Sequence, residues 1–187
     1  MTADDRPEAL LERTLDAASR DVQTVTPEGA SLAPLLEGMS IHRSPTHSDE
    51  RGTLTEIFDP RWEFHEEPLT YLYYITERPG YAKGWALHKQ HEDRYFIIRG
   101  ELEVVLYDVR PASSTRGQIC KLLLSDRDHG VVNIPAHVWH ATRNPGITDA
   151  ILVNTPTRLF DHADPDKYRL PLDTPLIPYS FGDTPGW

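Results

Sequence analysis

The segment from Met39 onward is built from short runs rich in β-branched and aromatic residues, and clusters of turn-forming residues separate these runs. Many short strands with no long helix among them are typical of a β-sandwich or a β-barrel. We predict strands at residues 53–58, 69–76, 82–87, 95–99, 101–107, 119–124, 131–134, 138–142 and 150–154. The tail over residues 161–187 is rich in Pro and Asp, and we expect it to wrap around the barrel as loops with one short helical turn.

The first part of the chain has a different character. Leu10, Leu11 and Leu15 recur at helical spacing, which predicts a short amphipathic helix within residues 7–20. We therefore divide the chain into an acidic arm with a short helix, residues 1–38, and a β-barrel domain with a wrapping tail, residues 39–187. We expect the arm to be a solvated extension, and the alternative is a helix that docks on a partner subunit.

The charge of the chain limits its partners. The 187 residues include 29 acidic and 19 basic side chains, for a net charge of −10. A nucleic-acid-binding protein usually carries a basic patch, so we expect no nucleic-acid partner. No apolar run is long enough to cross a bilayer, the N-terminus lacks a secretory leader, and Cys120 is the single cysteine. We therefore expect no membrane partner, no disulfide framework and a cytoplasmic location.

Two segments, residues 84–100 and 135–144, concentrate the residues that can carry chemistry. If their strands are neighbours in a barrel, strand alternation directs His88, Asp93, Tyr95 and His140 into the interior. A buried polar cluster is costly unless its members are paired or used. The cluster is therefore a candidate site, and the alternative is a satisfied interior network without a function.

These segments resemble the two motifs of the cupin superfamily. In the first motif a glycine precedes a pair of histidines, an acidic residue and a second glycine, and here Ala86 replaces the first histidine. In the second motif proline is followed by histidine and asparagine, at the spacing of Pro135, His140 and Asn144. The resemblance implies an all-β fold, a cupin jelly-roll β-barrel, which here follows an N-terminal helical arm.

A second resemblance is more specific. Asp-Glu-Arg-Gly-Thr-Leu-Thr-Glu at 49–56, Asp-Val-Arg-Pro-Ala-Ser-Ser-Thr-Arg-Gly at 108–117 and Ile-Pro-Ala-His-Val-Trp-His at 134–140 resemble motifs of the dTDP-4-dehydrorhamnose 3,5-epimerase family. Residues 83–100 also resemble the dTDP-sugar 3,4-ketoisomerases. The resemblance implies an enzyme, an epimerase or ketoisomerase, that moves a proton next to the ketone of a dTDP-4-keto-6-deoxyhexose. It also implies a homodimer paired through its N-terminal strands, and no cofactor.

The resemblance also implies roles for individual residues. His88 lies at the position of the family's base, and we predict Tyr95 and His140 as further catalytic residues. Arg51 and Glu56 lie where the family contacts the nucleotide. The predicted substrate-binding residues are Arg51, Glu56, Arg94 and Asn144.

The sequence departs from the epimerase pattern at two positions. Asp93 stands at the position of the family's lysine, and Val153 stands at the position of its tyrosine acid. Tyr95, Tyr74 or Arg94 are the candidate substitutes. A protein that binds a sugar nucleotide without catalysis is therefore an alternative function.

Asp93 also indicates a competing chemistry. With His88 and His140 it would offer a divalent metal, Fe, Mn, Ni or Zn, two imidazoles and one carboxylate. The alternative function is then a metal-dependent cupin, either an oxygenase or an isomerase.

Overall fold

The computed structural model describes residues 7–27 and 31–186, and the chain divides into two compact units, Met1–Ala33 and Pro34–Trp187. In the first unit, helix α1 spans Pro7–Ala17, and it ends three residues before the predicted limit. Its leucines at positions 10, 11 and 15 are exposed. None of the helices in the described residues has both the length and the apolar composition needed to span a membrane.

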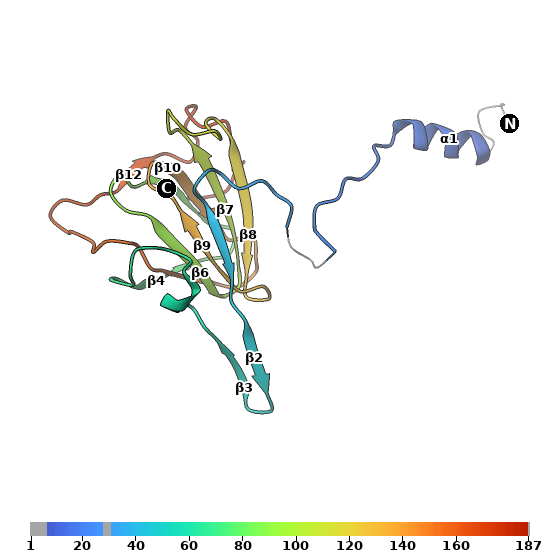
Figure 1. Cartoon of the computed structure of the whole chain (residues 1–187). Helices are drawn as coiled ribbons and strands as arrows, with labels where there is room; N and C mark the ends of the chain where they lie inside the picture. Colours follow the sequence, from blue (N-terminus) through green and yellow to red (C-terminus); the bar gives the residue numbers. More distant parts are fainter. Residues whose placement is uncertain (1–6, 28–30, 187) are drawn as a thin grey trace. The chain divides into compact units, whose positions relative to one another are not determined.

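The second unit is a β-barrel made from two sheets (Figure 1). One sheet has the strand order β1-β9-β6-β11-β4 and the other has the order β12-β5-β10-β7-β8, while β2 and β3 form a separate hairpin. Every strand pairing is antiparallel. The strands are β1 Ser40–Arg43, β2 Thr46–Asp49, β3 Gly52–Thr55, β4 Tyr73–Glu77, β5 Ala82–Leu87, β6 Asp93–Arg99, β7 Glu101–Asp108, β8 Ile119–Ser125, β9 Gly130–Ile134, β10 Val138–Arg143, β11 Ala150–Asn154 and β12 Tyr168–Leu170. This confirms the all-β prediction.

The main core lies between the two sheets. Alternating residues of β7, including Leu102, Val104 and Leu106, are almost fully buried against apolar residues such as Ile97 and Leu152 of the first sheet. Alternation would leave the outer face of the second sheet exposed to solvent, but part of this face is covered. The barrel therefore has buried residues on both sides of its central strands.

The C-terminal tail provides that cover. Ile177 and Phe181 of the tail pack against Trp85 of β5, Val105 of β7 and Ala141 of β10. The tail therefore wraps the barrel as expected, but residues 161–186 contain no helical turn. Instead β12 extends the second sheet by pairing with β5, a pairing that the strand pattern did not predict.

Most predicted strands are present, and β5 and β11 have the predicted bounds. The prediction missed β1, β2 and β12, which are three or four residues long and lack a buried alternating face. The strand predicted at 53–58 corresponds to β3, which ends at Thr55, and a 3-10 helix, η2 Pro60–Trp62, follows it. The β2–β3 hairpin is exposed almost throughout and extends away from the sheets (Figure 1).

Candidate active site

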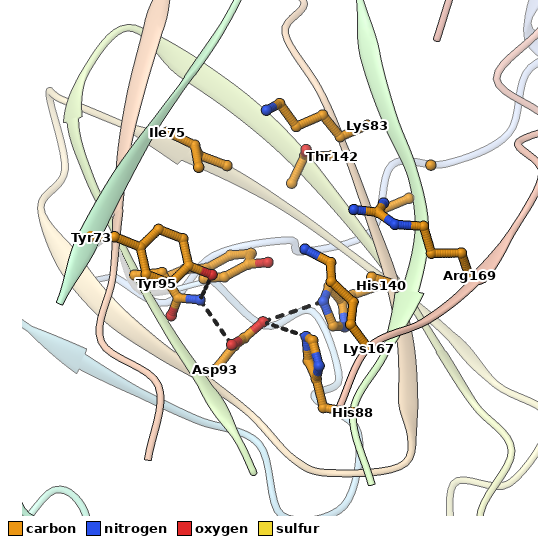
Figure 2. A pocket seen from close by; sticks show the side chains of 14 residues that line it. Tyr73, Ile75, Lys83, His88, Asp93, Tyr95, His140, Thr142, Lys167 and Arg169 are labelled. Atoms are coloured by element: carbon orange, nitrogen blue, oxygen red, sulfur yellow. Dashed lines mark hydrogen bonds and ion pairs between the residues drawn. The ribbon is translucent and has the colours of Figure 1, made fainter. Parts of the chain in front are cut away.

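A cavity of about 120 Å³ opens between the two sheets (Figure 2). Six strands and the segments beside them contribute side chains to its wall. The lining residues are Tyr73, Ile75, Lys83, Gly84, Ala86, His88, Asp93, Tyr95, His140, Ala141, Thr142, Asn154, Lys167 and Arg169. The structure thus brings together the four predicted interior residues, His88, Asp93, Tyr95 and His140, in one cavity.

Asp93 stands between two histidines at one end of this cavity. Its Oδ2 lies 3.3 Å from Nε2 of His88 and 3.3 Å from Nε2 of His140. The three residues are between 2% and 7% exposed. His88 follows β5, Asp93 begins β6 and His140 lies on β10, so the cluster joins the two sheets.

Backbone carbonyl groups fix the orientation of both imidazoles. Nδ1 of His88 donates to the carbonyl oxygen of Asp166, and Nδ1 of His140 donates to that of Val138 at 3.2 Å. A carbonyl can only accept, so each Nδ1 carries a hydrogen. In the neutral form of either ring, the lone pair of Nε2 therefore faces Asp93.

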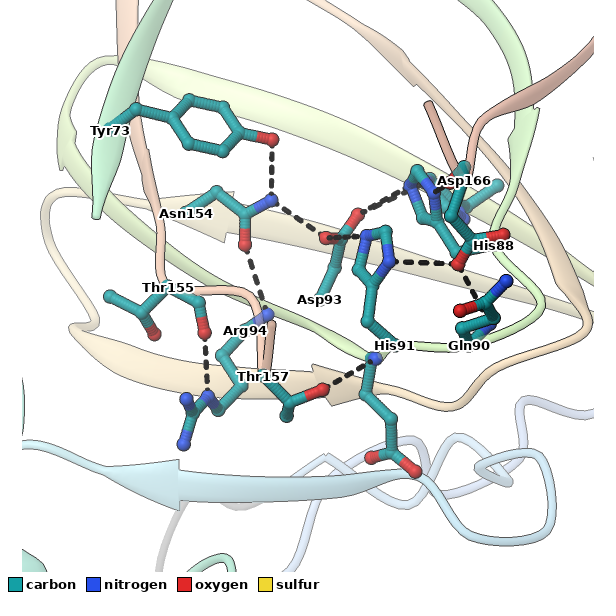
Figure 3. A network of polar contacts seen from close by, with 12 residues as sticks. Tyr73, His88, Gln90, His91, Asp93, Arg94, Asn154, Thr155, Thr157 and Asp166 are labelled. Carbon is teal, nitrogen blue, oxygen red and sulfur yellow. Dashed lines mark hydrogen bonds and ion pairs between the residues drawn. The ribbon is translucent and has the colours of Figure 1, made fainter. Parts of the chain in front are cut away.

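The other oxygen of Asp93 is held by an amide. Nδ2 of Asn154 donates to Oδ1 of Asp93 and to the hydroxyl of Tyr73, each at 2.8 Å (Figure 3). The Asn154 Oδ1 accepts from the backbone N–H of Arg94, which fixes the direction of the amide. Asp93 therefore presents Oδ2 to His88 and His140, while its Oδ1 lies 3.8 Å from Nε2 of His91.

The groups of the cluster shift one another's pKa. Burial raises the pKa of Asp93, but hydrogen bonds from His140 and His88 outweigh it and hold the pKa well below its usual range. Burial lowers the pKa of His88, but the hydrogen bond and the charge of Asp93 raise it by more. Burial and the charge of Asp93 raise the pKa of Tyr95 well above its ordinary value.

The loop after His88 is held by the side chain of Asp166. Its carboxylate accepts from the backbone N–H groups of Lys89 and Gln90, at 2.9 and 2.7 Å, and from Nδ1 of His91 at 2.9 Å (Figure 3). Burial and the neighbouring His88 lower the pKa of His91. The C-terminal tail therefore holds the loop that carries the candidate base.

Three cationic side chains that the sequence prediction did not name line the cavity: Lys83, Lys167 and Arg169. Lys83 is paired with Thr142, and Ala86 is paired with His140, so β5 has one residue more than β10 between the two pairs. This β-bulge turns Lys83 toward the cavity, whereas regular alternation from Ala86 and His88 would place it on the opposite face.

The other two cations come from the tail. Arg169 of β12 lies opposite Ala86, and Lys167 precedes it by two residues on the same face. Burial, Arg169 and Lys83 together lower the pKa of Lys167, although Asp93 opposes them. The small side chain of Ala86, at the position of a histidine in the cupin motif, faces this arginine.

Arg94, which was predicted to bind substrate, does not line the cavity. Arg94 is 1% exposed, and alternation along β6 turns it to the face opposite Asp93 and Tyr95. Its guanidinium donates to the backbone carbonyls of Thr155, Glu67 and Pro68 at 2.6, 2.8 and 3.0 Å. These bonds join the loop before β4 to the end of β11.

Asn144, which was also predicted to bind substrate, lies outside the cavity lining too. Asn144 is fully buried, and Nδ2 donates to the carbonyls of Glu77 and Thr148 at 2.7 and 2.8 Å. Its Oδ1 accepts from the N–H of Gly146. Asn144 therefore holds the turn that leads into β11.

Arg51 and Glu56 lie outside this cavity. Arg51 sits at the tip of the β2–β3 hairpin with its side chain 83% exposed, and it pairs with Asp49. Glu56 follows β3 and is partly exposed. Tyr74, one of the candidate substitutes, is 66% exposed, and Tyr73 lines the cavity instead.

The model of one protein family, described as the polysaccharide biosynthesis C-terminal domain, matches residues 47–168. The chain belongs to this family. The match includes the whole Asp93 cluster, the bulged strand β5 and Lys167.

Similar proteins include sugar epimerases and isomerases. A probable low-salt glycan biosynthesis epimerase, Agl13 of Haloferax volcanii, is 30% identical over 141 residues, which are 75% of this chain and 90% of the relative. The structure of a dTDP sugar isomerase from Desulfovibrio desulfuricans has a TM-score of 0.73 at 25% identity, and the match covers 79% of this chain and 94% of that one.

A third similar protein is ChmJ, a 3'-monoepimerase from Streptomyces bikiniensis, whose structure in complex with dTDP-quinovose has a TM-score of 0.69 at 24% identity. That match covers 82% of this chain and 80% of the other. These comparisons confirm the predicted resemblance to the epimerase family and the cupin jelly-roll fold.

Proposed function

We propose that this member of the family is an isomerase of nucleotide sugars, an epimerase or ketoisomerase of a dTDP-4-keto-6-deoxyhexose, with His88 as its base. The observation that carries this proposal is the fixed tautomer of His88, whose Nε2 faces the cavity beside Asp93. An imidazole with its Nδ1 hydrogen held by a carbonyl accepts a proton at Nε2. The kinship with sugar epimerases supports the same assignment.

The reaction begins when Nε2 of His88 removes the proton from the carbon next to the ketone. The negative charge of Asp93 stabilises the imidazolium that forms, and His140 shares this carboxylate at 3.3 Å. Tyr95 and Tyr73 keep their phenolic protons because burial raises the pKa of both groups, so each can donate a hydrogen bond to the sugar.

Lys83 supplies the positive charge for the enolate oxygen. A preorganised cation near a developing oxyanion is among the strongest contributions to such catalysis. Asp93 occupies the position of the family's lysine, and the bulge in β5 supports Lys83 as its substitute. Lys167 and Arg169 add positive charge to the same wall, where they would hold the diphosphate of the substrate.

The hairpin β2–β3 supports a homodimer. Arg51 and Leu54 are exposed on a hairpin that extends away from the sheets, so they do not contribute to the cavity of their own subunit. We propose that the hairpin packs on a second copy, where Arg51 and Glu56 contact the nucleotide. The cytoplasmic location stays a prediction.

Solvent exchange tests the function directly. In D₂O the protein should exchange the proton next to the ketone of dTDP-4-keto-6-deoxyglucose, and His88→Asn should slow this exchange by about 10²–10⁴-fold. A thermal shift with dTDP should persist in His88→Asn. Exchange by the variant at the wild-type rate would refute the base assignment. Binding of dTDP by a wild-type protein that exchanges no proton would instead support the non-catalytic alternative.

The geometry of the same cluster favours a second candidate function, a metal-dependent isomerase or oxygenase. Two ligands about 2.05 Å from a tetrahedral ion lie about 3.3 Å apart, and both His–Asp separations are 3.3 Å. A charge-assisted hydrogen bond is shorter, about 2.7–2.9 Å. Both imidazoles also donate Nδ1–H to a carbonyl, as metal-binding histidines usually do.

His88, Asp93 and His140 would hold such an ion, and it would act as a Lewis acid on a substrate oxygen. In that case His88 is a ligand and the base is another residue. Elemental analysis of the purified protein separates the two functions. Stoichiometric metal that is lost with activity in Asp93→Asn supports the second, and full activity after chelation supports the first.

A further inference from the structure

Glu77 is a buried carboxyl group behind the cavity wall, in contact with the lining residue Thr142. It is the last residue of β4 and is 2% exposed. Tyr73 and Ile75, at alternate positions of the same strand, line the cavity, so Glu77 faces the same interior. Its Oε2 accepts the hydroxyl hydrogen of Thr142 at 2.6 Å, and its Oε1 is buried with no hydrogen-bond partner among the described residues.

Thr142 connects this carboxyl group with the cavity. It lies on β10, two residues from His140, and lines the cavity next to Lys83, at the end away from His88 and Asp93 (Figure 2). A hydroxyl group has one hydrogen and two lone pairs, so it can accept from a protonated carboxyl while it donates to a substrate. His88 can therefore transfer a proton at one end of the cavity, and Glu77 can do so at the other end through Thr142.

The charges around Glu77 suit a group that both gives and takes a proton. Burial raises the pKa of Glu77 to about 7, while the hydrogen bond of Thr142 and the charge of Lys83 lower it. Tyr95 faces the same interior from β6, and Glu77 contributes to its raised pKa. A carboxyl group in this range is present in both forms near neutral pH.

We propose that Glu77 and Thr142 form a proton relay that returns a proton to the substrate at the end of the cavity away from His88. Thr142 Oγ1 gives its hydrogen to the carbanion carbon and takes the hydrogen of the Glu77 carboxyl, which becomes a carboxylate. His88 has gained the proton that the substrate lost, and both groups return to their starting states by exchange with water. The inference rests on the proposed function. It supplies a proton donor in place of the family's tyrosine acid, whose position Val153 occupies.

The test compares exchange with product formation in D₂O, using dTDP-4-keto-6-deoxyglucose and NMR. Glu77→Gln keeps an acceptor for Thr142 but has no proton to give. We expect proton exchange within about threefold of wild type, because His88 still removes and returns the proton. Isomerised product should fall by about 10²-fold or more. Thr142→Val should likewise keep proton exchange and lose product, and Thr142→Ser should restore product formation.

Glu103→Gln is the matched control, because Glu103 is also a buried strand glutamate but pairs with Lys121 and Arg143 outside the cavity. We expect its ratio of exchange to product to equal that of wild type. Equal loss of exchange and product in Glu77→Gln, or no loss of product, would overturn the relay. A wild-type protein that exchanges no proton would instead count against the proposed function.

A measurement without substrate tests the relay independently. The ¹³C resonance of the Glu77 carboxyl group, assigned by its absence in Glu77→Gln, should titrate near pH 7. Titration near its ordinary value of 4.5 would leave no proton to donate at neutral pH and would overturn the relay.

Discussion

Replacing Glu77 with Gln should change the stability of the protein in a pH-dependent way. The pKa of Glu77 rises from 4.5 to about 7 in the folded protein, chiefly through burial. The folded state therefore binds this proton more tightly than the unfolded state. Its contribution to stability is fully present below about pH 4.5 and is lost as the pH rises through about 7.

The size of the effect follows from the same shift. At ~1.36 kcal/mol per pKa unit, a rise from 4.5 to about 7 corresponds to roughly 3 kcal/mol. Glu77 is 2% exposed, so solvent screens this contribution little. Glu77→Gln lacks the titration, and the variant should gain up to roughly 3 kcal/mol relative to wild type between about pH 4.5 and 7. For a domain of this size the gain corresponds to about 6–12 °C in Tm.

Thermal unfolding by circular dichroism at closely spaced pH values measures this difference. The quantity of interest is the Tm of Glu77→Gln minus the Tm of wild type, since it removes the titration of all other groups. We expect the difference to rise with pH and to level off above about 7. Glu103→Gln should show no such rise. A flat difference for Glu77→Gln from pH 4.5 to 8 would show that the carboxyl group titrates normally and would refute the reasoning.

Three further predictions follow from the site and the hairpin. The rate of proton exchange should rise with pH as His88 loses its proton, and Asp93→Asn should move the midpoint of this rise to lower pH, because Asp93 raises the pKa of His88. A pH–rate profile in D₂O checks this, and an unmoved midpoint contradicts it. Lys83→Met should slow exchange by about 10²-fold or more while dTDP binding persists, as measured by NMR and thermal shift; unchanged exchange would remove Lys83 from the mechanism. Leu54→Asp on the exposed hairpin should convert a homodimer to a 21.3 kDa monomer in light scattering, whereas a monomeric wild type would contradict the dimer.

The sequence alone was sufficient for the fold class and for the cluster of interior residues at the centre of the candidate site. Runs rich in β-branched and aromatic residues, separated by turn-forming residues, defined most strands, and β5 and β11 have the predicted bounds. Strand alternation directed His88, Asp93 and His140 inward, and the packing of the two sheets face to face then brought Asp93 to 3.3 Å from each histidine. Arg94 illustrates the same rule, since alternation from Asp93 turns it away from the cavity.

Only the tertiary structure decided which other charges share the cavity with this cluster. Lys83 enters it through a bulge in β5, and a two-residue alternation contains no signal for one extra residue. Arg169 enters through the pairing of β12 with β5, across more than 80 residues of chain. Glu77 reaches Thr142 because the two sheets pack face to face. Register and sheet packing depend on contacts between distant segments, so local residue patterns determine the strands but not the neighbours that the strands acquire.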